Sequence, residues 1–462
     1  MKFKVAVITL GDTRKEFYQQ RIGIVERETA HLKVILSQEY DLYLSAPVFS
    51  MDESRKEAEI IKKQGIDTVI IHIPIWGTPN LVVPLAYSTE NPVLLLGNMR
   101  SDSSSMGALL ATAGMLEQAG KNLIRVLGDL DDVKTQGQIK QFIHVCKLVD
   151  GLKSTSFGLI GGRSIGIGTT ISDPAQWLRC LHIDCDQTDQ LEVVNRAEVI
   201  DIQRVQLYRQ WLDGLAGLCF GTTFTEKSLE KQIRSYLAMK DIIQDKGYDF
   251  VALKCQQELS DHYAVQCLTV SLLNNTFDAE GTKKVVPCAC EGDCDGALTM
   301  QMLHLLDDAQ PACLVDIRFF NESTKEFSFA NCGGMALGYA DCTTPQAAMK
   351  KTLMMQHVFG DAGGGTTQFM THGGAVTAAR LFRRNGKYFM GVFEGVSVEH
   401  SRESLTSNFC YPHAFLKADI DFNLFIRIMG ANHMHFIFGQ HAQDLQLFCK
   451  VKDIEFVNFN TN

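Results

Sequence analysis

Three short segments, far apart in the chain, each carry one good ligand for a divalent cation. Glu291 follows a cysteine-rich stretch, Asp316 follows the apolar run 311–315, and His433 lies near the C-terminus. Two carboxylates and an imidazole form a mixed oxygen and nitrogen donor set that suits Mn²⁺, Mg²⁺, Co²⁺ or Zn²⁺. Three protein ligands leave coordination positions open, and a catalytic metal needs such positions for its substrate.

Each of these residues also has a simpler interpretation. Glu291 could charge the first turn of the helix predicted to follow it, as Asp293 would. Asp316 could pair with Arg318, and a lone histidine in a strand is often an ordinary core residue. The hypothesis of a metal site therefore depends on the joint presence of all three.

The cysteines beside Glu291 offer a different site. Cys288, Cys290 and Cys294 could hold a structural zinc ion, but their spacing differs from the usual paired ligands and no second pair follows. We expect buried, reduced thiols instead. The 14 cysteines of the 462-residue chain are scattered without regular spacing, which favours a reducing cytoplasm over a disulfide framework.

The bulk composition excludes two classes of partner. The formal net charge is −9 without a basic block, so nucleic-acid binding is not expected. No apolar run approaches the ~18 residues of a membrane-spanning helix, and the short apolar stretch after Lys4 predicts a buried strand rather than a signal peptide.

The first 150 residues alternate short β-rich runs with amphipathic stretches, which predicts a parallel sheet flanked by helices. The expected strands are 4–10, 40–45, 68–73 and 92–96, and the expected helices are 16–38, 52–64 and 104–119, with Asp52 and Ser104 as N-caps. Loops that carry Arg14, Trp76 and Arg100 follow three of these strands, where open α/β sheets bind ligands.

A second α/β pattern restarts at residues 156–160 and continues through 181–184 and 250–254. From about residue 318, glycine becomes frequent and alternating stretches such as 387–393 and 424–428 indicate an antiparallel sheet or barrel. The predicted fold is therefore α/β, with two doubly wound parallel-sheet domains (1–150 and 151–318) and a β-rich, barrel-like domain (319–462). Glu291 and Asp316 fall in the second domain and His433 in the third.

A glycine-rich segment, 161–168, partly resembles a dinucleotide-binding fingerprint. It follows an expected strand, and Asp184 lies near the expected end of the next one, where an acidic residue binds a ribose. The glycine spacing departs from the fingerprint, so a tight turn near a substrate is the better interpretation. An NAD(P)-dependent sugar enzyme stays open as an alternative.

Several motifs together resemble the L-fucose isomerase and L-arabinose isomerase superfamily. They are the Glu-Gly-Asp segment at 291–299, the strand before Asp316, the Tyr-Pro-His-Ala-Phe segment at 411–415, and Ala-Asn-His at 431–433. The resemblance implies two α/β domains, a β-rich C-terminal domain and a metal at their junction. It implies that Glu291, Asp316 and His433 hold Mn²⁺, or another ion such as Co²⁺ or Mg²⁺, with Glu291 and Asp316 as the acid and base.

The same resemblance implies sugar contacts by Gln256, Asn432, His413 and Arg14. It also implies a homo-oligomer, a trimer or hexamer, in which Trp76 reaches a neighbouring subunit's site. The expected activity is aldose–ketose isomerisation of an unphosphorylated sugar: a 6-deoxyhexose, a pentose, or an anionic hexose such as sulfoquinovose.

An anionic sugar would need a cationic partner, and Arg14, Arg100 and Arg163 are the candidates. A non-catalytic sugar-binding protein with the same fold stays open as a further alternative.

Overall fold

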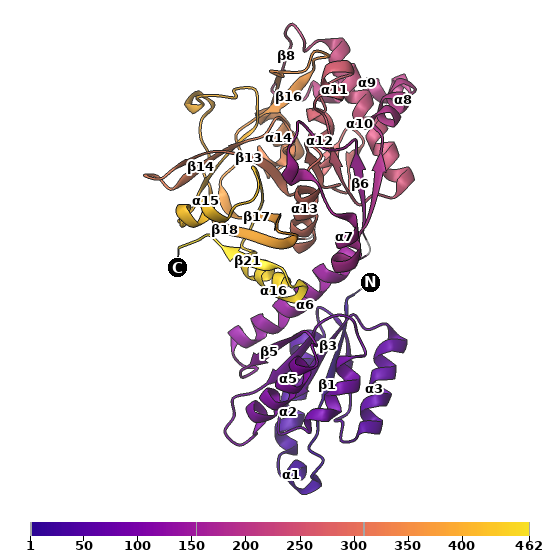
Figure 1. Ribbon diagram of the computed structural model, residues 1–462, viewed down its shortest axis with the longest axis vertical. Coiled ribbons are helices and arrows are strands. Elements are labelled where there is room, and N and C mark those ends of the chain that lie inside the picture. The colour runs from indigo at the N-terminus through magenta and orange to yellow at the C-terminus, as the bar shows by residue number, and fades with distance from the viewer. Residues whose placement is uncertain (1, 154, 308–309, 462) are drawn as a thin grey trace. The chain divides into compact units, whose positions relative to one another are not determined.

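The computed structural model describes residues 2–153, 155–307 and 310–461. The chain divides into two compact units, Met1–Gly151 and Leu152–Asn462 (Figure 1). Among the helices of the described residues, none is long and apolar enough to span a membrane.

The first unit is built on a five-stranded parallel sheet. Its strand order is β2-β1-β3-β4-β5, with β1 (Lys4–Thr9), β2 (Asp41–Leu44), β3 (Thr68–Ile73), β4 (Val93–Gly97) and β5 (Leu123–Leu127). Its longer helices are α2 (Ile22–Leu36), α3 (Met51–Gln64), α5 (Ser105–Gln118) and α6 (Val133–Lys153). Every residue of β3 and β4 is buried, as the continuous apolar runs of a covered parallel sheet require.

The strands of this unit follow the prediction closely, whereas its helix starts differ. The expected helix 16–38 is two helices, α1 (Lys15–Gln19) and α2, because Arg21 leaves the helical region at φ −121° and ψ 4°. The N-cap of α3 is Ser50 and not Asp52, since Ser50 forms a reciprocal capping box with Glu53. Ser104 precedes α5 as expected, but its side chain makes no capping hydrogen bond.

The second unit begins with a four-stranded parallel sheet in the order β12-β9-β6-β7. Its strands are β6 (Ser156–Ile160), β7 (Asp184–Thr188), β9 (Phe250–Leu253) and β12 (Cys288–Cys290). The helices of this part are α7 (Pro174–Leu181), α8 (Gln190–Glu198), α9 (Ile202–Leu212), α10 (Glu226–Lys246), α11 (Glu258–His262), α12 (Cys267–Leu273) and α13 (Cys294–Leu306).

The rest of this unit is dominated by a seven-stranded, mostly antiparallel sheet. Its order is β17-β20-β13-β14-β19-β18-β21, with β13 (Cys313–Asn321), β14 (Glu326–Ala330), β17 (Gly374–Arg384), β18 (Lys387–Ser397), β19 (His413–Lys417), β20 (His433–Phe438) and β21 (Glu455–Asn458). Because β17 also pairs with β18 along its whole length, six of the strands close on themselves, and β21 adds to β18 in parallel.

Smaller elements complete the unit. A three-stranded sheet joins β8 (Gly217–Cys219), β15 (Leu353–Gln356) and β16 (Gly365–Gln368), and α14 (Pro345–Lys351), α15 (Phe422–Ile428) and α16 (Ala442–Lys452) lie among the later strands. The prediction of a strand at the alternating stretch 424–428 is wrong, because these residues belong to α15. Asp421 caps the start of this helix by accepting a hydrogen bond from the Leu424 N–H at 2.9 Å.

The mixed α/β fold with parallel sheets and a β-rich C-terminal region is thus confirmed. The doubly wound detail and the division into three domains stay predictions. The strand expected to end before Asp316 continues to Asn321 as β13, so Asp316 lies within the closed sheet. Helix α13 packs against β9 and β12 of the parallel sheet and against β17 and β20 of the closed sheet. It therefore joins the two sheets at the place where Glu291 lies.

Candidate metal centre

Two of the three candidate ligands face each other across neighbouring strands. Asp316 of β13 is the register partner of His433 of β20 in an antiparallel pair. Directly opposed residues project from the same face of a sheet with their Cβ atoms about 5 Å apart. The backbone pairing alone therefore brings a carboxylate and an imidazole together, although they are more than 100 residues apart in the chain.

The third candidate ligand comes from the turn between β12 and α13. Glu291 has φ +59° and Gly292 has φ +62°, so the turn uses two left-handed residues in succession. A Cβ on Gly292 would lie 2.4 Å from the Gly162 carbonyl oxygen, and this close approach explains the glycine. A glutamate in the left-handed region is uncommon and directs the Glu291 side chain toward His433.

The three side chains form one compact group. His433 Nε2 lies 3.1 Å from Glu291 Oε2 and 3.2 Å from Asp316 Oδ1. One ligand atom from each residue lies within 4.8 Å of the other two. The His433 side chain is fully buried, whereas those of Glu291 and Asp316 are 13% and 14% exposed. The group is thus closed on the imidazole side and partly open on the carboxylate side.

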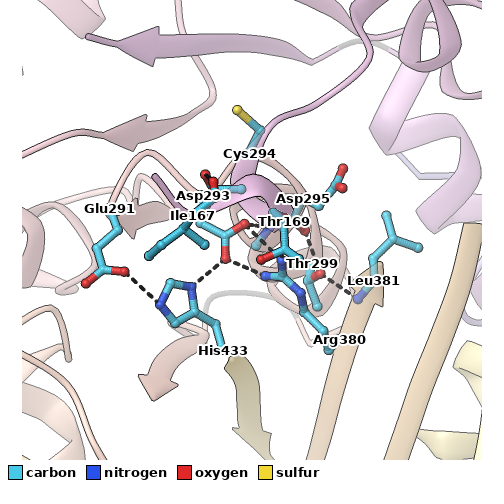
Figure 2. Close-up of polar contacts among 12 residues, drawn as sticks. Ile167, Thr169, Glu291, Asp293, Cys294, Asp295, Thr299, Arg380, Leu381 and His433 are labelled. Atoms are coloured by element: carbon cyan, nitrogen blue, oxygen red, sulfur yellow. Dashed lines mark hydrogen bonds and ion pairs between the residues drawn. The ribbon is translucent and has the colours of Figure 1, made fainter. Parts of the chain in front are cut away.

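The orientation of the imidazole is fixed from behind. His433 Nδ1 lies 2.7 Å from Asp293 Oδ2, so Nδ1–H donates to this carboxylate and Nε2 is directed at Glu291 (Figure 2). Asp316 lies on the same side of the ring, 3.2 Å from Nε2. Asp293 is itself fully buried, accepts hydrogen bonds from both terminal nitrogens of Arg380, and caps α13 through the Gly296 N–H. Carboxylate partners of this kind hold a metal-binding histidine in one tautomer and orientation.

The electrostatics of the group favour an added cation. Burial raises the pKa of Glu291, with Asp316 contributing further and His433 opposing the shift. Burial would likewise raise the pKa of Asp293, but Arg380 and His433 hold it well below its usual range. Burial would lower the pKa of His433, yet Asp293, Asp316 and Glu291 raise it well above its usual value. The protein thus places two carboxylates around one imidazole nitrogen, a donor set that fits a divalent cation.

The simpler interpretations of these residues are partly right. Asp293 does cap α13, and Arg318 Nη2 does pair with Asp316 Oδ2 at 3.0 Å. Both carboxylates nevertheless contact His433: Asp293 lies next to Nδ1 and Asp316 lies next to Nε2.

Two residues predicted to bind substrate lie beside this centre. His413 pairs with Ala330, and Ala330 pairs with Asp316, so one register row runs from His433 through Asp316 to His413 on one face of the closed sheet. His413 Nδ1 contacts the Tyr411 carbonyl oxygen at 2.9 Å, and burial lowers its pKa. Asn432 is exposed next to His433.

Gln256 is half-buried in the loop after β9, the strand that pairs with β12 before Glu291. The remaining predicted residues, Arg14 and Trp76, belong to the first unit. The Arg14 guanidinium pairs with Asp12 at 2.8 Å, and Trp76 packs against the core of that unit. The roles of all of these residues in substrate binding stay predictions.

The position of Asp184 does not fit the dinucleotide-binding fingerprint. Asp184 was expected near the end of a strand, but it is the first residue of β7, at the edge opposite to the one where these sheets bind ribose. The glycine-rich segment instead packs closely against the Glu291 turn through Gly162. This contact agrees with a tight turn close to the candidate site.

The cysteine set around Glu291 separates. Cys290 Sγ lies 3.4 Å from Cys332 Sγ, while Cys294 Sγ contacts the Gly292 carbonyl oxygen. Within the described residues, the groups compact enough to hold a metal include none of Cys288, Cys290 and Cys294.

Two features were missed from the sequence. The first is the contact of Asp293 with His433 and Arg380. His433 lies 140 positions and Arg380 lies 87 positions after Asp293 in the chain, so no local spacing links them. A second compact group contains Cys267, Cys332 and His357, again from separate segments. Only the fold brings each set together.

Comparisons with known proteins find similarity over part of the chain. Residues 329–460 match the family model described as L-fucose isomerase, C-terminal domain. This range includes His413 and His433 but not Glu291 or Asp316. A curated relative, "Sulfoquinovose isomerase" from Alkalicoccus urumqiensis, is 22% identical over 279 residues, which are 59% of this chain and 58% of the relative. The chain thus spans somewhat more than half the length of that relative. Over part of its length the chain is thus similar to an L-fucose isomerase C-terminal domain and to a sulfoquinovose isomerase.

Proposed function

We propose that the protein interconverts an unphosphorylated aldose and its ketose with the help of a divalent cation held by Glu291, Asp316 and His433. The observation that carries the proposal is the convergence of these three ligand atoms, with His433 Nε2 directed at both carboxylates. The match of residues 329–460 to the L-fucose isomerase C-terminal domain and the name of the curated relative support the reaction class.

The chemistry requires removal of a weakly acidic proton next to a carbonyl group. A divalent cation in this site would supply Lewis-acid stabilisation of the negative charge that develops on two neighbouring substrate oxygens. The carboxylates of Glu291 and Asp316 are the groups of this chain placed to remove the proton from one carbon and to deliver a proton to the other. Burial raises the pKa of Glu291, which makes its carboxylate a stronger base than that of an exposed glutamate.

The surrounding residues would hold the metal ligands in place and orient the sugar. Asp293 and Arg380 hold His433 rigidly, so that Nε2 and the two carboxylates need little reorganisation when substrate binds. His413, on the same row of the closed sheet, is placed to contact a sugar hydroxyl beyond Asp316. Gln256 and Asn432 would contact hydroxyls from the two flanking loops.

The substrate is a 6-deoxyhexose, a pentose or a sulfoquinovose-like hexose. The curated relative's name favours the last of these, and a sulfonate needs a cationic partner. Arg318 is close to the centre, since its Nη2 contacts Asp316 and its charge lowers the pKa of His413. We therefore add Arg318 to Arg14, Arg100 and Arg163 as candidate partners of an anionic group. In the first unit, Arg100 pairs with Asp102 at 3.1 Å, while Arg163 is exposed near the Glu291 turn.

The homo-oligomer, a trimer or hexamer with Trp76 reaching a neighbouring site, is part of the proposal, as is a cytoplasmic location. Light scattering of the purified chain would give the oligomer size. A monomer that isomerises sugar at full rate would contradict the contribution of Trp76 from a second subunit.

The decisive experiment is metal-dependent exchange. The protein is stripped with chelator, reloaded with Mn²⁺ and incubated in deuterated water with L-fucose, D-arabinose, L-arabinose or sulfoquinovose. Deuterium at C2 with formation of the ketose, lost in Glu291→Gln and kept in Glu322→Gln, would support the proposal. Glu322 is a matched control because it is an exposed carboxylate outside the centre.

Other outcomes would point elsewhere. Tight binding of metal and sugar without exchange would favour the non-catalytic sugar-binding alternative. Activity that needs NAD(P)H and no metal would favour the NAD(P)-dependent alternative. Full exchange by Glu291→Gln would contradict the role proposed for this carboxylate.

A further inference from the structure

A second group of metal-ligand side chains lies in the same unit, separate from the candidate active site. Cys267 begins α12, Cys332 follows β14 and His357 follows β15. One ligand atom from each residue lies within 4.8 Å of the other two. The three residues are only 4%, 8% and 3% exposed, so this group is closed to solvent.

A third thiol extends the group. Cys290, the last residue of β12, is 3% exposed, and its Sγ lies 3.4 Å from Cys332 Sγ. In tetrahedral zinc sites, Zn–S bonds of 2.3 Å place two thiolate sulfurs about 3.8 Å apart. The Cys290–Cys332 separation differs from that value by a few tenths of an ångström, but Cys290 does not belong to the compact group of Cys267, Cys332 and His357. The Cys290 side chain would therefore have to rotate toward the other ligands to complete the set.

The imidazole of His357 is oriented as a metal ligand would be. Its Nδ1 lies 3.1 Å from the Phe359 carbonyl oxygen and 3.2 Å from the Phe359 backbone nitrogen, so the backbone after β15 holds the ring in place with Nε2 on the far side. Its Nε2 is buried and makes no regular hydrogen bond among the described residues, although His357, after Cys267 and Cys290, helps to lower the pKa of the Cys332 thiol. A buried polar nitrogen without a partner is costly, and a metal bound at Nε2 would remove this cost.

The backbone has a close approach that serves this group. Gly333, directly after Cys332, has φ +126°, and a Cβ there would lie 2.7 Å from Cys267 Cβ and 2.2 Å from Thr366 Oγ1. A side chain at this position would push the Cys332 loop away from α12. The glycine therefore allows the two thiols to meet.

We propose that Cys267, Cys290, Cys332 and His357 form a structural zinc site. Three sulfurs and one imidazole nitrogen are a complete tetrahedral donor set for Zn²⁺, with no position left open for a substrate. Binding would release the three thiol protons, since thiolates are the ligands. A disulfide would use two of the three sulfurs and leave both the third thiol and His357 Nε2 without a partner, so the geometry favours the metal.

The site would have a consequence for the first centre. Cys290 immediately precedes Glu291 in the chain, and the other three ligands come from α12 and from the ends of β14 and β15. A zinc ion would therefore tie the Glu291 turn to three other elements. It would position Glu291 without contacting substrate.

The test uses Co²⁺ as a spectroscopic substitute for Zn²⁺ in the full-length, reduced protein. Thiolate ligands give Co²⁺ an intense near-ultraviolet charge-transfer absorption, which a site of two carboxylates and an imidazole does not. We expect this absorption in the wild type, one equivalent of Zn²⁺ that displaces it, and protection of three thiols from alkylation by bound Zn²⁺. The absorption should be lost in Cys332→Ser and in His357→Ala.

Two control variants separate this site from the rest of the molecule. Cys449→Ser changes a buried thiol of α16 outside the group and should keep the absorption. Asp316→Asn should keep it as well, so the result is independent of the proposed isomerase function. The wild-type spectrum needs no variant and stays informative if a variant fails to fold.

Absence of the thiolate absorption in the reduced wild type would overturn the proposal. A disulfide between Cys290 and Cys332, found by mass spectrometry in protein purified without reductant, would overturn it too.

Discussion

Two neighbouring residues, Cys290 and Glu291, belong to two different groups of candidate metal ligands. We call the Glu291 group the open face and the Cys290 group the closed face. Glu291 joins a carboxylate and an imidazole in a group that is partly open. Cys290, one residue earlier, joins sulfurs and an imidazole in a group that is closed. Hard oxygen donors with open positions suit catalysis, and a full set of soft donors suits structure. Under the two proposals, adjacent residues would therefore serve a catalytic site and a structural site.

The largest effect should come from the open face. Glu291→Gln keeps the size of the side chain but removes a charged ligand and a proton acceptor. We expect isomerase activity to fall by about 10³-fold or more, measured as ketose formation at saturating Mn²⁺. The closed face should be unaffected, so the Co²⁺–thiolate absorption should persist in this variant. Loss of both signals together would mean that the two groups are one site.

Asp293 contacts His433 Nδ1, on the side of the imidazole away from Glu291 and Asp316. A substitution there tests whether this contact orients His433. Asp293→Asn weakens the contact with His433 Nδ1 and leaves Arg380 without its ion pair. We expect the affinity for Mn²⁺ to fall by about 10–100-fold, read from the metal dependence of the rate. Activity should recover substantially at high Mn²⁺, because Asp293 positions a ligand and does not touch substrate. A variant with unchanged metal dependence would show that Asp293 only caps α13.

The contrast between the faces explains what could be predicted from the sequence. Glu291, Asp316 and His433 could be proposed from the sequence because each is a metal-ligand residue type next to or within an apolar run that predicts a strand, although Asp316 lies inside β13 and not at its end. The thiol group was missed because its four ligands come from four segments whose spacing matches no paired motif. Asp184 was misplaced because a strand's existence is easier to read than its limits. The start of α3 at Ser50 depended on a reciprocal side-chain contact with Glu53.

Asp295, a buried carboxylate in the first turn of α13, should make the stability of the protein depend on pH. Burial raises its pKa to about 6, although Arg383 and Arg380 oppose the shift, whereas an unfolded chain gives about 3.9. The folded state therefore binds this proton more tightly than the unfolded state. Lowering the pH from 7 toward 4 should raise the free energy of unfolding of the wild type relative to Asp295→Asn by about 1–3 kcal/mol.

Urea unfolding followed by tryptophan fluorescence would measure this difference, because Trp177 donates a hydrogen bond to Tyr388, which in turn contacts Asp295. A difference between the two proteins that stays constant from pH 7 to pH 4 would contradict a raised pKa for Asp295.

The smallest effect should distinguish substrates at the open face. Arg318 is 41% exposed and pairs with Asp316, so its charge is available to an anionic sugar but is partly screened by water. We expect Arg318→Ala to raise KM for sulfoquinovose by about 3–10-fold and to leave KM for a neutral aldose nearly unchanged. Arg318→Lys should recover part of the difference, because it keeps the charge and loses the planar, two-point contact. Equal losses for both sugars would assign Arg318 to Asp316 alone, and the cationic partner would then lie among Arg14, Arg100 and Arg163.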